Sequence, residues 1–386
     1  MDFDLYEVAR NGCFPILNLA LDNIGLYNID VNRPDGKGNI LLHYAADQGH
    51  FETVEKLLSL NSNPDFPDRK HNTALHLASR NGHSSIVTLL LTKGADINAR
   101  NYSGETPIFE SVKSRDLTLT TSLIEKDAKI DIKNKGNETL LHVAVKSGDE
   151  EIVRMFLEKG LDVNSRTACG ETPLQEAIRS EFEDLIEILI EFGGDCTVKT
   201  ALNQTLLHLA VLHNKIRTCE YLILNNVPID CVDINGSTAL HYAAENNYTS
   251  IASLLIQNHA NVNQKDEDDY TPIHVAACKK TSLETFDILL KNGADTESVT
   301  VNGDLPLHCA AANENELAVI ALYRKDLLMR RNKCDLTPSL LARQCGNLSI
   351  VRLLNNLEIS EQNANNALHK KRVSFAETPS IKSRKV

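Results

Sequence analysis

Thr271-Pro272-Ile273-His274-Val275-Ala276 is the clearest copy of a segment that returns along most of this 386-residue chain. The same pattern reads Thr73-Ala74-Leu75-His76-Leu77-Ala78 nearer the start. Its Thr recurs every 33 residues, at positions 73, 106, 139, 172, 205, 238 and 271. The same step extends the register back to Ile40, and steps of 34 and 32 extend it forward to Leu305 and Thr337. A fixed period of this length predicts one structural unit copied along the chain, with each copy packed on the next.

Each copy carries the start and stop signals of two helices. Thr73 suits the N-cap of a short first helix, because its hydroxyl can accept a free backbone N–H of the first turn. Where Pro follows the Thr, as at Pro107, it falls at the first helical position, which needs no N–H donor. Gly82 favours the left-handed conformation that ends the helix. A second helix follows, with Leu89 and Leu90 in its apolar stripe.

The end of the second helix tests the period independently. The position that follows it requires a positive φ, which Gly, Asn, Asp and His adopt more readily than other residues. The occupants of this position are Asn61, Gly94, Asp127, Gly160, Gly193, Asn226 and His259. An extended segment such as Ala95-Asp96-Ile97-Asn98 and a turn such as Ser103-Gly104 then lead to the next Thr.

A 33-residue period that carries T-P-L-H-x-A resembles the ankyrin repeat, and the resemblance covers roughly nine tenths of the chain. It implies an all-α solenoid of about ten to eleven helix-turn-helix units with hairpin fingers. It also implies a concave surface, lined by the fingers and the first helices, that binds a protein partner.

The register divides the chain into four parts. Residues 1–36 lack the Thr-x-Leu-His core and are expected to form an N-terminal capping repeat, because a terminal copy exposes one face to water. Residues 37–336 hold the regular repeats, and residues 337–356 are expected to form a C-terminal capping repeat. The period then stops and polar residues dominate, so residues 357–386 are expected to form a disordered basic tail.

Composition limits the classes of partner. The net charge is −12, and the last 30 residues hold six basic and three acidic residues, which leaves −15 for residues 1–356. An acidic body argues against direct binding of nucleic acid. No apolar run is long enough for membrane insertion, and nine scattered Cys without a close pair fit a reduced compartment. We therefore expect a cytoplasmic or nuclear location.

The titratable residues favour packing over catalysis. Seven of the thirteen His occupy one position of the repeat, so stacking holds them roughly 10 Å apart instead of bringing them together as metal ligands. No nucleophile elbow, metalloprotease motif or phosphate-binding loop occurs. The sequence thus predicts a non-enzymatic protein without a metal or cofactor.

Two acidic stretches are candidates for a recognition surface on the concave side. One repeat carries Glu176, Glu183 and Asp184, and one finger reads Asp266-Glu267-Asp268-Asp269-Tyr270. A solvated face and a docking site for a basic segment of a partner are both open interpretations.

Three Asn residues also lie at one position of the repeat, in the segments that lead into the fingers. Asn98, Asn164 and Asn263 resemble the sites at which some animal ankyrin repeats are hydroxylated. The simpler interpretation is that each side chain hydrogen-bonds its own loop.

The tail holds a sharper motif, Lys370-Lys371-Arg372-Val373-Ser374-Phe375-Ala376-Glu377. It is similar to the R-V-x-F motif through which regulatory subunits hold the catalytic subunit of type-1 serine/threonine protein phosphatase. The resemblance implies that Arg372, Val373, Ser374 and Phe375 dock as an added strand, with Val373 and Phe375 in apolar pockets. Lys370 and Lys371 match the basic flank of that motif.

The position of the motif distinguishes it from a related arrangement. The myosin phosphatase targeting subunits, which the combination also resembles, carry the motif before their ankyrin repeats, whereas here it follows them. This order favours a simple tether. Ser374 is a candidate phosphorylation site, because the basic residues before it suit a basophilic kinase and a phosphate there would oppose docking.

Other functions remain open for the same residues. Lys371 and Arg372, followed by Lys382, Arg384 and Lys385, loosely resemble a bipartite nuclear import signal. The basic tail is also suited to fold back on the acidic repeats in an autoinhibitory contact. The competing prediction is a plain ankyrin adaptor or effector with no phosphatase link.

Overall fold

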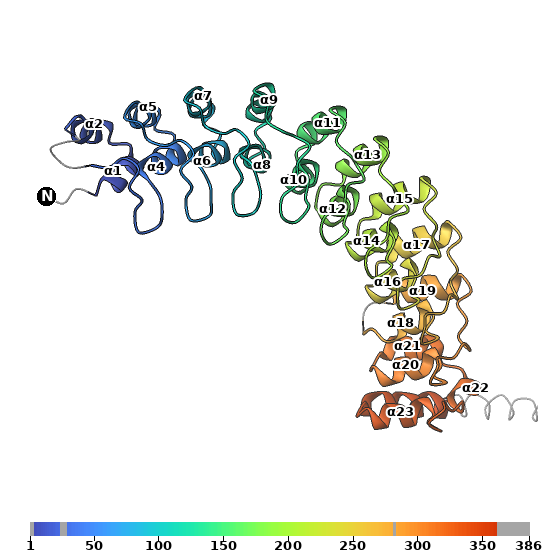
Figure 1. Ribbon diagram of the computed structural model, residues 1–386. Helices are drawn as coiled ribbons and strands as arrows, with labels where there is room; N and C mark the ends of the chain where they lie inside the picture. Colours follow the sequence, from blue (N-terminus) through green and yellow to red (C-terminus); the bar gives the residue numbers. More distant parts are fainter. Residues whose placement is uncertain (1–3, 24–28, 281–282, 361–386) are drawn as a thin grey trace, which may run out of the picture. The chain divides into compact units, whose positions relative to one another are not determined.

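The computed structural model describes residues 4–23, 29–280 and 283–360 (Figure 1). This part of the chain consists of paired helices joined by loops, and its extended pairing is limited to two isolated bridges, Lys133 with Thr139 and Lys199 with Thr205. The predicted all-α repeat architecture is therefore confirmed.

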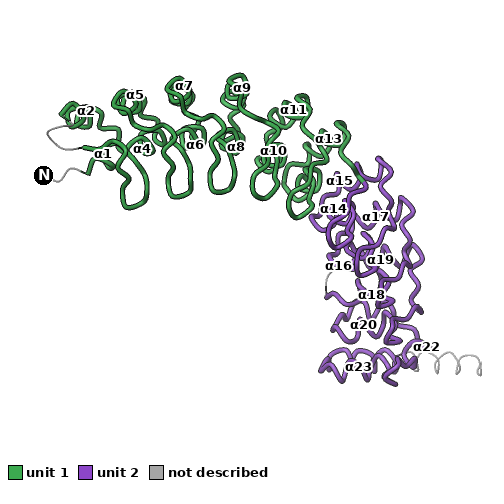
Figure 2. The backbone as a smooth tube through the Cα atoms, in the orientation of Figure 1, with its two compact units in different colours: residues 1–196 green, residues 197–386 purple. Residues whose placement is uncertain are grey.

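The chain divides into two compact units, residues 1–196 and 197–386 (Figure 2). Within each unit the first helices of the repeats form one layer, called here the inner helices. In the first unit they are α1 (Leu5–Asn11), α4 (Leu41–Gln48), α6 (Ala74–Arg80), α8 (Pro107–Lys113), α10 (Leu140–Ser147) and α12 (Pro173–Arg179). In the second they are α14 (Leu206–Leu212), α16 (Ala239–Glu245), α18 (Pro272–Ala277), α20 (Pro306–Ala312) and α23 (Pro338–Gln344).

The second helices form the other layer, called here the outer helices. In the first unit they are α2 (Phe14–Asp22), α5 (Phe51–Ser59), α7 (Ser84–Thr92), α9 (Leu117–Glu125), α11 (Glu150–Glu158) and α13 (Asp184–Glu191). In the second unit they are α15 (Ile216–Leu224), α17 (Thr249–Gln257), α19 (Glu284–Lys291) and α21 (Glu316–Leu322). The short helix α22 (Lys325–Leu328) follows α21, and a last helix covers residues 348–360.

The core lies between the two layers and between successive repeats. Leu75 and Ala78 on α6 and Leu90 on α7 are fully buried, and the same positions are buried in most of the other repeats. Inner helices contact the inner helices of adjacent repeats as well as the outer helix of their own repeat. Burial of apolar surface at these contacts is the main stabilising contribution, and no repeat has a closed core of its own.

The recurrent Thr and His form one hydrogen-bonded unit. The Nδ1 atom of His76 accepts from the backbone N–H of Thr73 at 3.1 Å and lies 3.0 Å from its hydroxyl. Thr73 is the N-cap of α6 and forms a capping box with His76, and the hydroxyls of Thr139, Thr172 and Thr205 accept the N–H three residues later, as predicted. Since Nδ1 accepts, the ring proton resides on Nε2, which donates to the carbonyl of Glu105 in the next repeat at 3.1 Å.

The helix-ending position behaves as its residue types predict. Asn61, Asp127, Asn226 and His259 have φ values of 61°, 66°, 59° and 69°, and Gly94 has 89°. These residues turn the chain out of each outer helix and into the segment that leads to the next finger.

Candidate protein-interaction surface

In the first unit the fingers extend from the side of the inner helices (Figure 1). We call the surface formed by the fingers and the inner helices the finger face. Its geometry depends on a repeated turn. In one finger, Oδ1 of Asp68 accepts hydrogen bonds from the backbone N–H groups of Lys70 and Asn72, both at 2.7 Å. Such a side-chain acceptor fixes a tight turn that would otherwise leave those donors unpaired.

The turn acceptor recurs in every finger of the described chain. The residues that accept from the backbone N–H four positions later are Asp35, Asp68, Asn101, Asn134, Thr167, Thr200, Asp233, Asp266, Thr300 and Asn332. The sequence reading missed this series. Its signal was available, because Asp, Asn or Thr occupies one position at the same period.

Backbone hydrogen bonds also tie neighbouring fingers together. In the first unit the N–H of Tyr102 donates to the carbonyl of Lys70 at 2.8 Å. In the second unit the N–H of Ile234 donates to Leu202 at 3.0 Å, and that of Val301 donates to Asp268 at 2.9 Å. The fingertips therefore form a connected row in each unit, which presents side chains from a fixed backbone.

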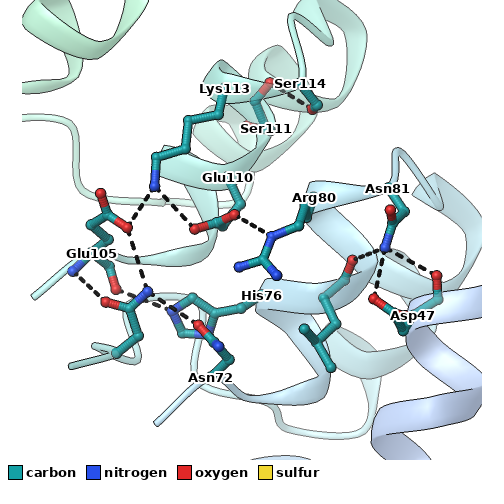
Figure 3. Close-up of polar contacts among 12 residues, drawn as sticks. Asp47, Asn72, His76, Arg80, Asn81, Glu105, Glu110, Ser111, Lys113 and Ser114 are labelled. Atoms are coloured by element: carbon teal, nitrogen blue, oxygen red, sulfur yellow. Dashed lines mark hydrogen bonds and ion pairs between the residues drawn. The ribbon is translucent and has the colours of Figure 1, made fainter. Parts of the chain in front are cut away.

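A buried carboxylate marks the finger face of the first unit. Glu110 on α8 is almost fully buried, and Figure 3 shows its carboxylate between Arg80 of α6 and Lys113 of its own helix. Arg80 Nε lies 2.7 Å from Glu110 Oε2, and Lys113 Nζ lies 3.3 Å from Oε1. Burial alone would raise the pKa of Glu110, but the hydrogen bond from Arg80 and the charge of Lys113 outweigh it and lower the pKa.

The cations of this cluster belong to a periodic column. Arg80, Lys113, Lys146 and Arg179 occupy the same position near the end of successive inner helices. Each of the last three forms an ion pair with the Glu eight residues before it, namely Glu105, Glu138 and Glu171. The carboxylates lie deeper than the cations, so the exposed ends of this row are positive.

The first predicted acidic stretch is split between the two layers. Glu176 lies on the inner helix α12, where its carboxylate is 3.9 Å from Lys146 Nζ. Glu183 and Asp184 lie instead at the start of the outer helix α13, so they do not lie on the finger face. The sequence placed all three together because they share one repeat, whereas the two helices of a repeat belong to different layers.

The second acidic stretch lies on the finger face, but its residues have different roles. Asp266 is the turn acceptor and bonds the N–H groups of Asp268 and Tyr270. Burial raises the pKa of Asp266. Asp269 pairs with Lys265 at 3.2 Å, and the Tyr270 carbonyl accepts from His241. Glu267 and Asp268 are the two exposed acids of this finger.

Apolar side chains are exposed on both sides of that acidic finger. Leu202 and Ile234 are 54% and 55% exposed on the two fingers before it, and Val301 is 45% exposed on the finger after it. The backbone hydrogen bonds described above place these residues on adjacent fingers of one row. Sequence reasoning did not single them out, since a lone Leu or Ile in a loop carries no motif.

The three Asn side chains form hydrogen bonds with the next repeat. The sequence interpretation, that each bonds its own loop, was wrong. Asn263 Nδ2 donates to the carbonyl of Gly293 at 3.0 Å, and its Oδ1 accepts from the N–H of Asp295 at 2.8 Å. Asn164 makes the same two bonds three repeats earlier, to Gly193 and Asp195. Oδ1 of Asn98 accepts from the N–H of Lys129.

Comparison with known families agrees with this architecture. The family model described as ankyrin repeats (3 copies) matches residues 5–101, 108–200, 161–229, 185–266, 207–300 and 251–328. The chain belongs to the ankyrin-repeat family. A comparison with curated proteins gave no match. Ankyrin repeats serve as protein-binding scaffolds, and no catalytic family matches the chain.

Two further observations concern the described part of this ankyrin-repeat chain. No helix there is long and apolar enough to cross a membrane. Within the same residues, no group of three or more His, Cys, Asp or Glu side chains is arranged to hold a metal ion. The tail motif, with Lys370, Lys371, Arg372, Val373, Ser374 and Phe375, lies outside the described residues.

Proposed function

We propose that this ankyrin-repeat protein is a cytoplasmic or nuclear scaffold that holds one protein on its finger face and tethers a type-1 serine/threonine phosphatase through Arg372–Phe375. The observation that carries the first half is the connected finger row of the second unit. Turns like that of Asp266 and hydrogen bonds between fingers fix its backbone. The side chains of Glu267, Asp268 and Ile234 are exposed and take no part in the core. Residues that are free of packing roles are available for recognition.

The chemistry of that row suggests the kind of segment it would hold. Exposed carboxylates of Glu267 and Asp268 lie between apolar side chains, Ile234 on one side and Val301 on the other. An extended segment with a basic residue between two apolar residues would match this order of charges and apolar contacts. Successive repeats are roughly 10 Å apart, so about three residues of extended chain separate the matching side chains.

The tail motif supports the second half. In an extended peptide, alternate side chains share one face, so Val373 and Phe375 would enter neighbouring pockets while Ser374 faces away. The tether would act through effective concentration, because an enzyme and a target held on one chain meet almost as parts of one molecule. No chemistry by the repeats themselves is required.

A binding experiment with two matched variants tests both halves. Full-length chain, Val373→Ala/Phe375→Ala and Glu267→Lys/Asp268→Lys are immobilised and incubated with purified phosphatase catalytic subunit, and separately with lysate. We expect the tail variant to lose about tenfold or more in phosphatase binding and to keep its other partners. The finger variant should keep the phosphatase and lose a partner with a basic segment. Equal phosphatase binding by wild type and tail variant would contradict the tether and leave a plain adaptor.

The candidate switch at Ser374 has its own test. A phosphate there would add nearly two negative charges and would be desolvated when the strand docks, so we propose that phosphorylation weakens docking. Affinities of the plain and phosphorylated 366–380 peptides for the catalytic subunit decide this point, and equal affinities would exclude the switch.

The basic residues of the tail also support a second function, nuclear import. Residues 366–386 fused to a fluorescent reporter should accumulate in the nucleus if Lys371, Arg372 and the later basic residues act as an address. An autoinhibitory role would appear differently, as stronger partner binding after residues 361–386 are removed.

A further inference from the structure

Two cysteines lie on either side of the junction between two adjacent repeats of the second unit. Cys278 ends α18, and Cys309 lies on α20 of the next repeat. Helices α18 and α20 pack against each other, and the two thiols are close enough for each to shift the pKa of the other. Cys309 is buried, while Cys278 is partly exposed and therefore open to small solutes.

The pair occupies positions that make contacts elsewhere in the solenoid. Cys278 has the repeat position of Arg80 and Lys146, and Cys309 has that of Glu110 and Glu176. In the first unit these two positions bridge adjacent repeats through ion pairs. These two positions therefore face each other across the junction between adjacent repeats, and in the second unit Cys278 and Cys309 occupy them.

The surroundings favour reaction at Cys278. The neighbouring Cys309 thiol and the charge of Lys279 lower the pKa of Cys278, which increases its thiolate fraction. Burial and the neighbouring Cys278 thiol raise the pKa of Cys309. Because Cys278 is partly exposed and Cys309 is buried, Cys278 is the attacking thiol and Cys309 is the resolving thiol.

We propose that Cys278 and Cys309 form a redox modification site, at which a hydroperoxide converts the pair to a disulfide between adjacent repeats. The Cys278 thiolate attacks the peroxide oxygen, which breaks the O–O bond and gives a sulfenic acid and, after proton uptake, one water or alcohol. The Cys309 sulfur then attacks the sulfenic sulfur, the S–O bond breaks, and water leaves. Two thiols are oxidised to one disulfide, and the peroxide takes up both electrons and both protons.

The disulfide would lie beside the acidic finger. The Tyr270 ring of this finger packs on the His274 ring of α18, with 5.7 Å between the ring centroids, and burial raises the pKa of its hydroxyl. Oxidation would therefore join α18 to α20 under the finger that carries Glu267 and Asp268. This site does not depend on the proposed phosphatase tether or on any partner of the finger face.

Mass spectrometry of the full-length chain tests the proposal without any mutation. The reduced chain is treated with hydrogen peroxide, free thiols are blocked by alkylation, and the protein is digested with trypsin. Residues 266–279 and 292–324 then form two peptides with one cysteine each. We expect a linked peptide whose mass is two hydrogens below the sum of the two, at least about tenfold more abundant than any other cysteine pair. Dithiothreitol should remove it.

Variants and a denatured sample complete the test. Cys278→Ser and Cys309→Ala should abolish the linked peptide, whereas Cys334→Ser in the same unit should leave it unchanged. In guanidinium the nine cysteines should pair without this selectivity. Oxidation of Cys278 to sulfinic acid without linkage, or preferential linkage of Cys278 to another cysteine in the folded chain, would overturn the proposal.

Discussion

Nε2 of His76 donates a hydrogen bond to the carbonyl of Glu105, 3.1 Å away in the next repeat. The same ring accepts from Thr73 through Nδ1, so one buried side chain fixes both its own helix and its neighbour. The other His residues of this position make the corresponding bond to a carbonyl 23 to 30 residues later. The strongest sequence signal of the chain is therefore an inter-repeat connection and not a reactive site.

Replacing His76 with Phe separates the packing of this ring from its hydrogen bonds. Phe109 occupies the same position of the next repeat and is fully buried, so the site accepts an aromatic ring of this size. His76→Phe should lower the free energy of unfolding by about 2 kcal/mol, because the Thr73 N–H loses its buried acceptor. Urea unfolding of the full chain measures the change. The exposed His71→Ala serves as the control, and equal midpoints for the two variants would contradict the bridging role.

Acid should destabilise the solenoid through the same histidines. Burial lowers the pKa of His274 from 6.5 to about 4, and it lowers the pKa of the other six as well. Between these values the unfolded chain binds more protons than the folded chain, so the free energy of unfolding falls as the pH drops from 6.5 to 4. For His274 alone the full effect is about 3 kcal/mol. Above pH 6.5 these groups contribute no pH dependence.

His274→Gln provides the matched test of this pH dependence. Gln175 occupies the same position in another repeat and accepts from the Thr172 N–H at 2.9 Å, so the amide can replace the ring. The variant should lose part of the slope of unfolding free energy against pH between 6.5 and 4. A slope identical to that of wild type would show that His274 does not remain neutral in the fold.

Periodic residues predicted the fold because they are the residues that pack. The Thr caps its helix, the His bonds the next repeat, and the helix-ending residue takes the positive φ that redirects the chain. The same period contained the finger-turn acceptors, such as Asp68, which went unnoticed because Asp, Asn and Thr alternate there. A shared structural role is hard to recognise in a sequence when three residue types can fill the position.

The candidate surface was harder to predict because it depends on the layer to which a residue belongs. Glu176 and Glu183 are seven residues apart in one repeat, yet one lies on an inner helix and the other precedes an outer helix. Glu110 was missed since a single Glu in an apolar helix resembles an exposed position, whereas Arg80 and Lys113 hold it in the interior. The number of charged residues in a segment does not show which of them form ion pairs with an adjacent repeat.

Removal of the Glu110 carboxylate should be costly because of this pairing. Glu110→Ala leaves the partners Arg80 and Lys113 without their shared counterion and opens space beside α8, and we expect a loss of about 3 kcal/mol in unfolding free energy. Glu150→Ala removes an exposed carboxylate that pairs with Arg154, and it should cost about 0.5 kcal/mol or less. Urea unfolding compares the two. Similar losses for both variants would show that burial of Glu110 adds nothing.

Two acids of one finger, Asp266 and Asp268, should respond differently to substitution. Asp266→Ala removes the acceptor of the Asp268 and Tyr270 N–H groups, so it should lower the unfolding free energy by about 1 to 2 kcal/mol. Asp268→Ala removes an exposed carboxylate and should change stability by less than about 0.5 kcal/mol. If the finger binds a basic segment, Asp268→Ala should weaken partner binding most at low ionic strength, and the loss should shrink as salt concentration rises and screens the charges. Binding that is unaffected at any salt concentration, with stability intact, would assign the acidic finger to solvation alone.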